Sequence, residues 1–388
     1  MLRSTDRILT THAGALPRSE ELHKLVFARA AGERVEREPL AQRLQKETAE
    51  VVRRQVACGV DGVNDGEVGK TTFTSYVQER LAGFEVRKMK PGDPPPLFIA
   101  SRDLKRFPEY FVGGRGFSRF AGTGQGRPRM ICTGPLRYVG EADLKDELDN
   151  FRTALAGVKV EEAFLPANTP GTIEHWLHNA YYPNDEGFLL AIAEAMRSEY
   201  LAIVEAGFTL QIDDPDLPDG WQMYPDMSVA DYRRYAMLRV EALNHALRGI
   251  PKEKIRLHVC WGSFHGPHQF DIPLKEIVDI IFRVHAGSYS IEASNPRHEH
   301  EWRVFESVKL PQDAVLIPGV VGHATDFIEH PELIAQRLVR YARLVGRENV
   351  VAGTDCGLGP RVGEGEIAWA KLESMAEGAR LATKELWG

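Results

Sequence analysis

The stretch FLLAIAEAMRSEYLAIVEAGFTLQIDD, residues 188–214, decides the fold because it joins a helix pattern directly to a strand pattern. Residues 188–207 have the apolar spacing of an amphipathic helix and end in glycine, as a helix C-terminus should. The run at 209–214 predicts a short buried strand that ends in two aspartates. A second helix pattern at 331–346 also ends in glycine.

The same alternation of strand and helix runs through most of the chain. Eight strand-like runs lie at 8–14, 59–65, 160–167, 209–214, 255–260, 288–293, 315–321 and 350–356. Near-continuous apolar strands separated by helices are typical of a parallel sheet. We therefore predict the α/β class and a (β/α)8 TIM barrel, with residues 1–388 forming one catalytic domain. Residues 85–140, rich in proline, glycine and arginine, predict an insertion with short strands or an ordered loop over the barrel mouth.

Composition excludes several classes of function. The chain has 388 residues, 43% hydrophobic and 27% charged, and a net charge of −7. It therefore lacks the basic surplus that binds nucleic acid or anionic lipid. No apolar run approaches ~18 residues, and the N-terminus lacks the pattern of a signal peptide, so we expect a cytoplasmic protein. Four widely spaced cysteines are too few for a disulfide framework, which leaves reduced thiols or metal ligands.

Polar side chains gather at the ends of the predicted strands, where the chemistry of parallel barrels takes place. His258 and Cys260 lie two positions apart on one strand and therefore share a face. The other polar residues at strand ends are Glu67, Asp213, Glu292 and Cys356. Two thiolates, one imidazole and one carboxylate would suit a tetrahedral Zn²⁺ site. A His-x-Cys pair alone is weak evidence, since cysteine is often simply buried. We expect the neighbouring His265, His268, His298 and His300 to lie in solvated loops.

Several of these segments together resemble a known family. The segments TTHAGALPRSEEL, NDGEVGKTTF, LQIDDPDL, HVCWG, YSIEAS, IPGVV and GTDCGLG look like the carboxyl-terminal barrel of cobalamin-independent methionine synthase. The family's shorter relatives include epoxyalkane:coenzyme M transferase. The resemblance implies that zinc is bound by His258, Cys260, Glu292 and Cys356. It also implies that Glu67 and Asp213 hold the amino group of homocysteine and that Trp176 packs against a folate ring.

The chain departs from the family pattern at two points. The family's glycine-serine-phenylalanine-proline turn is GALP here, so Ala15 removes a hydroxyl beside the thiol substrate. Gly322 replaces the family's aspartate, and His323, assigned by resemblance as the catalytic proton donor, is shifted in register by about one place.

Three hypotheses on function follow from these residues. The first is zinc-dependent methyl transfer to homocysteine, giving methionine. The second is the opening of an epoxide by a small thiol such as coenzyme M, for which Arg18 and Lys70 could supply positive charge. The third is a hydrolytic or non-enzymatic zinc barrel. Glu67 and Asp213 favour the first, because carboxylates attract an ammonium and repel a sulfonate. The expected partners are a small-molecule thiol and a methyl or alkyl donor, with a folate and a corrinoid as candidate donors and a homo-oligomer left open.

Overall fold

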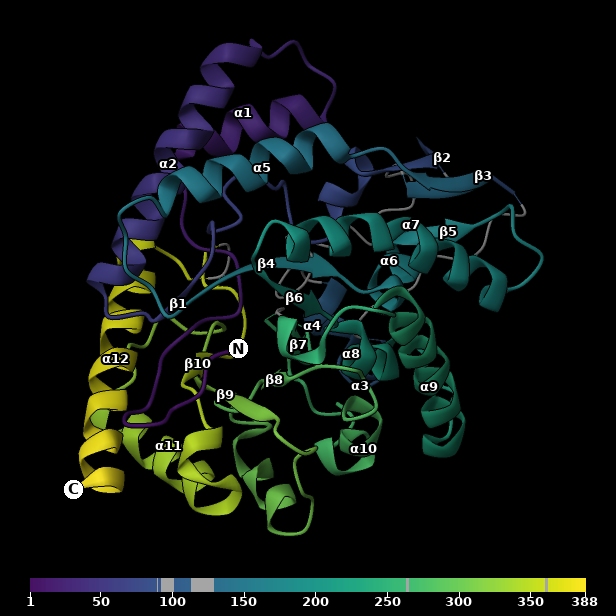
Figure 1. Ribbon diagram of the computed structural model, residues 1–388. Coiled ribbons are helices and arrows are strands. Elements are labelled where there is room, and N and C mark those ends of the chain that lie inside the picture. The colour runs from purple at the N-terminus through teal and green to yellow at the C-terminus, as the bar shows by residue number, and fades with distance from the viewer. Residues whose placement is uncertain (89, 92–100, 113–128, 263–264, 360–361) are drawn as a thin grey trace.

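The centre of the molecule is a parallel sheet that curls into a barrel (Figure 1). The computed structural model describes residues 1–88, 90–91, 101–112, 129–262, 265–359 and 362–388. Within them, seven strands follow the order β1-β4-β6-β7-β8-β9-β10. Their bounds are β1 (Gly62–Val63), β4 (Glu162–Asn168), β6 (Thr209–Asp213), β7 (Ile255–Val259), β8 (Ser288–Ile291), β9 (Val315–Val321) and β10 (Gly353–Thr354).

The first predicted strand, residues 8–14, closes the ring. Thr10 forms a parallel bridge with Ala352, beside β10. On the other side, the backbone N–H groups of Asp61 and Gly62 donate to the carbonyl oxygen of Thr10 at 3.0 and 2.9 Å. The segment therefore lies between β10 and β1, and the predicted (β/α)8 barrel is confirmed. That residues 1–388 form one domain stays a prediction.

Helices cover the outside of the barrel (Figure 1). The longer ones are α1 (Glu20–Ala30), α2 (Arg37–Ala57), α5 (Glu141–Ala154), α7 (Asp185–Glu205), α9 (Val229–Ala246), α11 (Pro331–Val345) and α12 (Gly365–Trp387). The shorter ones are α3 (Ser101–Arg106), α4 (Pro108–Val112), α6 (Pro170–Trp176), α8 (Asp216–Met223) and α10 (Val278–Ile281). Short 3-10 helices lie at Ser75–Glu79, Lys252–Lys254, Leu274–Glu276, Glu299–Glu306 and Arg347–Asn349.

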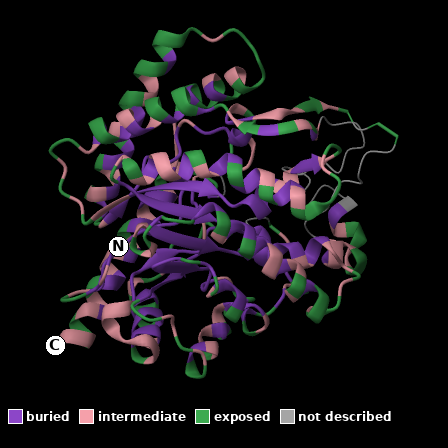
Figure 2. Ribbon diagram, turned by 45° about the vertical axis from the view of Figure 1, so that its right-hand side comes forward, coloured by how far each residue is buried: buried purple, intermediate pink, exposed green. Residues whose placement is uncertain are grey.

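The two helices predicted at 188–207 and 331–346 correspond to α7 and α11, and each ends at a glycine. Gly207 after α7 and Gly346 after α11 have φ of 97° and 91°, a region that side chains with a Cβ rarely adopt. All residues of β6, β7, β8 and β9 are buried, and Figure 2 shows buried residues concentrated along the strands. This explains why the strands are apolar almost without interruption. None of the helices in the described ranges is both long and apolar enough to cross a membrane.

A second, smaller sheet lies only partly within the predicted insertion, residues 85–140, because β2 begins before it and β5 comes well after it. Its strands are β2 (Leu81–Arg87), β3 (Arg129–Tyr138) and β5 (Leu177–Asn179), with β2 antiparallel and β5 parallel to β3. Helix α3 contacts α8, because the Arg102 guanidinium lies 3.4 Å from the centre of the Trp221 ring and donates to the Trp221 carbonyl oxygen at 2.6 Å. Much of the expected cover over the barrel mouth, residues 92–100 and 113–128, lies outside the described residues.

Candidate metal and substrate site

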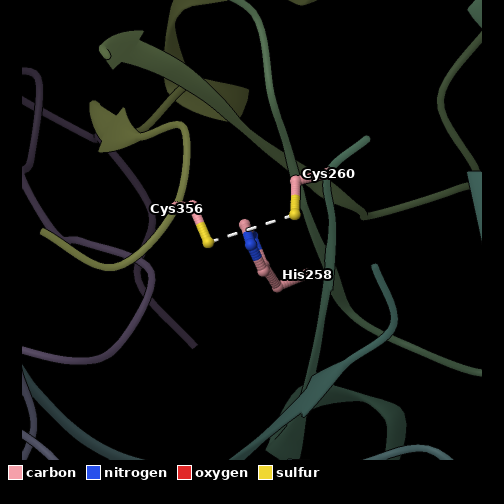
Figure 3. A group of neighbouring side chains, drawn as sticks. All are labelled: His258, Cys260 and Cys356. Atoms are coloured by element: carbon pink, nitrogen blue, oxygen red, sulfur yellow. Dashed lines mark hydrogen bonds between the residues drawn. The ribbon is translucent and has the colours of Figure 1, made fainter. Parts of the chain in front are cut away.

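Three potential metal ligands converge at the carboxyl end of the parallel strands. His258 lies in β7, Cys260 follows that strand, and Cys356 follows β10. Their ligand atoms all lie within 4.8 Å of one another, and the two sulfurs are 4.0 Å apart. Figure 3 shows the imidazole of His258 pointing toward the gap between the sulfurs. This donor set is one that zinc accepts.

The hydrogen bonds of His258 leave one ring nitrogen facing the thiols. Nδ1 lies 3.0 Å from the hydroxyl oxygen of Ser290 in β8. Nε2 is buried and makes no hydrogen bond within the described residues. Histidines that bind metals commonly use their second ring nitrogen in this way, which fixes the tautomer and the ring orientation. The orphaned Nε2 therefore fits a metal ion held between His258 and the two cysteines.

The two cysteines differ in their readiness to lose a proton. Cys260 donates a hydrogen bond to the sulfur of Cys356. That bond holds the pKa of Cys356 well below its usual range and raises the pKa of Cys260. Cys356 is thus inclined toward the thiolate form, which is the form that binds metals.

Glu292, the fourth expected ligand, is not a member of this group of three. It follows β8, and its Oε2 accepts from the backbone N–H of Trp261 at 2.7 Å while Oε1 accepts from the Asn295 side chain at 2.9 Å. Glu292 instead groups with His323 and Asp355, whose ligand atoms lie within 4.8 Å of one another. All three are buried. The structure thus forms two adjoining clusters where the sequence predicted one ligand set.

Two buried carboxyl groups lie at the ends of neighbouring strands. Asp213 ends β6 and pairs in register with His258. Glu67 follows β1 with a φ of 52°, and a Cβ on Gly14 would lie 2.5 Å from its Oε1, so only glycine leaves it room. Burial raises the pKa of Glu67 to about 8 and that of Asp213 to about 6. A cation entering here would favour the ionised form of both groups.

A cavity of about 700 Å³ is lined by Glu67. Ala15 and Trp176 also line it, whereas Asp213 is not among the lining residues. Trp176 ends α6, and its buried Nε1 makes no hydrogen bond among the described residues. A cavity of this size accommodates a small molecule. The predicted substrate residues Ala15, Glu67 and Trp176 therefore share one cavity.

The two basic residues near the mouth are already engaged inside the protein. The Lys70 ammonium is buried, donates to the Pro166 carbonyl oxygen at 2.5 Å, and lies 3.9 Å from Glu67 Oε2 and from Glu147 Oε1. Arg18 donates to the backbone carbonyl oxygens of Val68 at 3.0 Å, of Thr71 at 3.1 Å and of Lys70. Both side chains line the cavity; Lys70 faces the carboxyl groups of Glu67 and Glu147, whereas the Arg18 guanidinium is held by neutral carbonyl oxygens.

The expectation of solvated histidine loops is right for His265 and His300, which are exposed, and wrong for His268 and His298, which are buried. His298 Nε2 lies 3.1 Å from Asp271, and its Nδ1 lies 2.8 Å from Glu301. Burial opposes the charge of His298, but these hydrogen bonds raise its pKa to about 10. The acidic partners are 27 residues and three residues away in sequence, so the distant one could not be inferred from local pattern.

Asp355 is a buried carboxylate that the sequence analysis did not assign. It lies immediately before Cys356 and is 1% exposed. A carboxylate inside an apolar strand end is the same signal that singled out Glu292. Applied to residues 350–356, that signal would have found Asp355.

Comparisons with known proteins agree with the fold. Residues 167–381 match the model of the family described as cobalamin-independent synthase, catalytic domain. A methionine synthase of Thermococcus kodakarensis is 24% identical over 379 residues, covering 97% of this chain and 94% of that protein. A methionine synthase of Saccharolobus solfataricus is 26% identical over 381 residues, covering 97% and 95%. A B12-independent methionine synthase from Shewanella sp. W3-18-1, solved with selenomethionine, superimposes with a TM-score of 0.72 at 19% identity, covering 98% and 99%.

Proposed function

The chain belongs to the family of cobalamin-independent synthases, and from this we propose that it transfers a methyl group to the sulfur of homocysteine, giving methionine. The observation that carries the proposal is that Glu67 lines the cavity and interacts with Asp213, which in turn interacts with His258 and Cys356 of the cluster. An amino-thiol needs both parts: a group that attracts its ammonium and a group that activates its sulfur.

We propose His258, Cys260 and Cys356 as ligands of one Zn²⁺ ion, with Glu292 as the fourth ligand. Bound zinc would lower the pKa of a substrate thiol, which otherwise is near 8.5, and so make its sulfur nucleophilic at neutral pH. Glu292 would exchange its present hydrogen bonds from Trp261 and Asn295 for the metal. Three anionic ligands suit alkyl transfer to sulfur better than the activation of water.

The substrate's amino acid portion would be held by carboxylates. Glu67 lines the cavity, and Asp213 on β6 pairs in register with His258 on the neighbouring strand β7. When the two groups ionise, they offer charge-assisted hydrogen bonds to an ammonium. Trp176 offers a flat apolar surface in the same cavity on which the ring of a methyl donor could stack. A folate and a corrinoid stay open as donors.

Methyl transfer breaks the bond between the methyl carbon and the donor and forms a bond between that carbon and sulfur. The thiol proton leaves, and the donor's leaving group takes up a proton. We propose His323 as the residue that holds this proton. It follows β9 and lies beside Glu292 and Asp355, and carboxylates near an imidazole stabilise its protonated form.

The alternative reaction, opening of an epoxide by a sulfonate-bearing thiol, has less support. Lys70 and Arg18, the cations that could attract a sulfonate, already have internal partners. Glu67, which lines the cavity, would repel it when ionised.

A thiol and donor screen with product mass analysis on the zinc-loaded protein tests the proposal. Homocysteine should become methionine with at least one methyl donor, and coenzyme M should not be alkylated by epoxides. Alkylation of coenzyme M with no turnover of homocysteine would replace the proposed reaction by the alternative. The Asp213→Asn variant is the matched control, since it should lose turnover of homocysteine while still binding zinc.

A further inference from the structure

Asp355 connects two loops that the sheet itself keeps apart. Its Oδ1 accepts hydrogen bonds from the backbone N–H groups of Ala293 and Ser294 at 2.8 and 2.9 Å. Its Oδ2 accepts from the Ser294 hydroxyl at 2.6 Å. Ala293 directly follows Glu292, and Asp355 directly precedes Cys356. One carboxylate therefore binds the chain next to two of the proposed metal ligands.

The sheet order shows why such a connection is needed. Strand β9 lies between β8 and β10, so no ladder of backbone hydrogen bonds joins the strand before Glu292 to the strand before Cys356. Asp355 is tied to β9 through its own N–H, which donates to the Val321 carbonyl oxygen at 2.9 Å. From there its side chain reaches past β9 to the end of β8.

The Asp355 side chain can lie across β9 because residue 319 of that strand is glycine. A Cβ placed on Gly319 would lie 2.2 Å from Asp355 Oδ1 and 2.7 Å from Asp355 Cα, closer than real Cβ atoms approach. The φ of Gly319 is not among the positive values. The requirement for glycine is therefore one of space for the carboxylate and not of backbone conformation.

We propose that Asp355 is a positioning residue, which fixes Glu292 and Cys356 relative to each other so that both can bind the same metal ion. The inference rests on the proposed metal ligand set. Metal sites tolerate errors in ligand distance of about 0.2 Å, and loops alone rarely supply that precision. Two backbone N–H groups and one hydroxyl bound to the same buried carboxyl group hold the loop after β8 against the residue before Cys356.

Asp355 is better suited to this role than to that of a ligand. Although its carboxylate lies within 4.8 Å of the ligand atoms of Glu292 and His323, three hydrogen bonds already occupy it. As a ligand it would have to give up bonds that hold the loop after β8. As a positioning residue it keeps all three.

The test uses the full-length protein and measures zinc affinity by competition with a chromophoric chelator, together with the visible spectrum of the cobalt-substituted form. Asp355→Ala removes both acceptor oxygens and with them all three hydrogen bonds, and Asp355→Asn retains one oxygen. Gly319→Ala displaces Asp355, its backbone together with its carboxylate, without changing any polar group. Gly353→Ala is the matched control, because Gly353 pairs with Gly319 in register but a Cβ there would meet the Ile317 side chain at 2.6 Å.

We expect Asp355→Ala and Gly319→Ala to weaken zinc binding roughly 10- to 100-fold and to alter the cobalt–thiolate bands, as loss of a residue that orients ligands does. Asp355→Asn should lie between Asp355→Ala and the wild type, and Gly353→Ala should match the wild type. Should Asp355→Ala fail to fold, Gly319→Ala and Ser294→Ala decide by the same two measurements. Wild-type zinc affinity and an unchanged cobalt spectrum in Gly319→Ala would overturn the inference. Zinc binding that depends on Asp355 in a protein unable to methylate homocysteine would refute the proposed function and still support this role.

Discussion

The affinity of the protein for an amino acid ligand should rise with pH because Glu67 must ionise before it can attract an ammonium. Burial raises the pKa of Glu67 to about 8, whereas the neighbouring Lys70 lowers it and Asp213 raises it further. Below that pH the cavity presents a neutral carboxyl group. The ammonium of the ligand stays protonated across this range, so the change in affinity reports on the protein.

The magnitude follows from the shift itself. Each pH unit below the pKa adds about 1.36 kcal/mol to the cost of ionising the carboxyl group. At pH 6, about two units below the pKa of Glu67, the cost is about 2.7 kcal/mol, or roughly 100-fold in Kd. The Kd should therefore fall about tenfold per unit between pH 6 and pH 7.5 and level off above pH 8.

Isothermal titration calorimetry with methionine measures this dependence, because methionine carries the amino acid portion of homocysteine without a thiol that titrates. At pH 7, buffers of different ionisation enthalpy should reveal the release of close to one proton per methionine bound. Glu67→Gln should bind methionine more weakly and with a Kd that hardly changes from pH 6.5 to pH 8. Asp213→Asn is the matched control: it should weaken binding and, because the Asp213 charge raises the pKa of Glu67, keep the slope but make it level off at a lower pH.

A Kd independent of pH in the wild type would refute the reasoning. An unchanged slope in Glu67→Gln would assign the proton to another group and remove Glu67 from the ammonium site.

Three further predictions concern the metal, the substrate and the buried ion pairs. Replacing Cys260 or Cys356 by serine should sharply reduce zinc content, measured by elemental analysis, because a hydroxyl is a poor substitute for a thiolate; full occupancy in both variants would exclude them as ligands. Asp213→Asn should leave zinc in place and weaken homocysteine binding by roughly 1.5 to 3 kcal/mol, measured by calorimetry. His298→Ala should lower the free energy of unfolding in urea at pH 7 by about 3 kcal/mol, because it leaves the buried Asp271 without one of its cationic partners; a change below about 0.5 kcal/mol would show that His298 contributes no net stability.

The sequence predicted the barrel because its signals are local. The glycines after α7 and α11 and the uninterrupted apolar strands each reflect a few neighbouring residues. The first strand position was also found, although residues 8–14 form only a parallel bridge. The pairing of His298 with Asp271 and the separation of Glu292 from the three other donors depend on contacts between distant segments. Such contacts leave no spacing pattern in the chain.

The sequence predicted which residues lie at strand ends, but it did not predict how their charges interact or how their pKa values shift. Besides burial, the charges of Asp213, Asp65 and Glu147 raise the pKa of Glu67, while Lys70 is the one buried ammonium that the described residues place against Glu67. Burial raises the pKa of Asp65 to about 6, as it does for Asp213. Lys70 lies 3.9 Å from Glu67, yet the pKa of Glu67 stays near 8, so a substrate ammonium beside it would favour its ionised form. Amino acid binding should therefore release the Glu67 proton, and affinity, proton release and the charge of Glu67 should change together with pH.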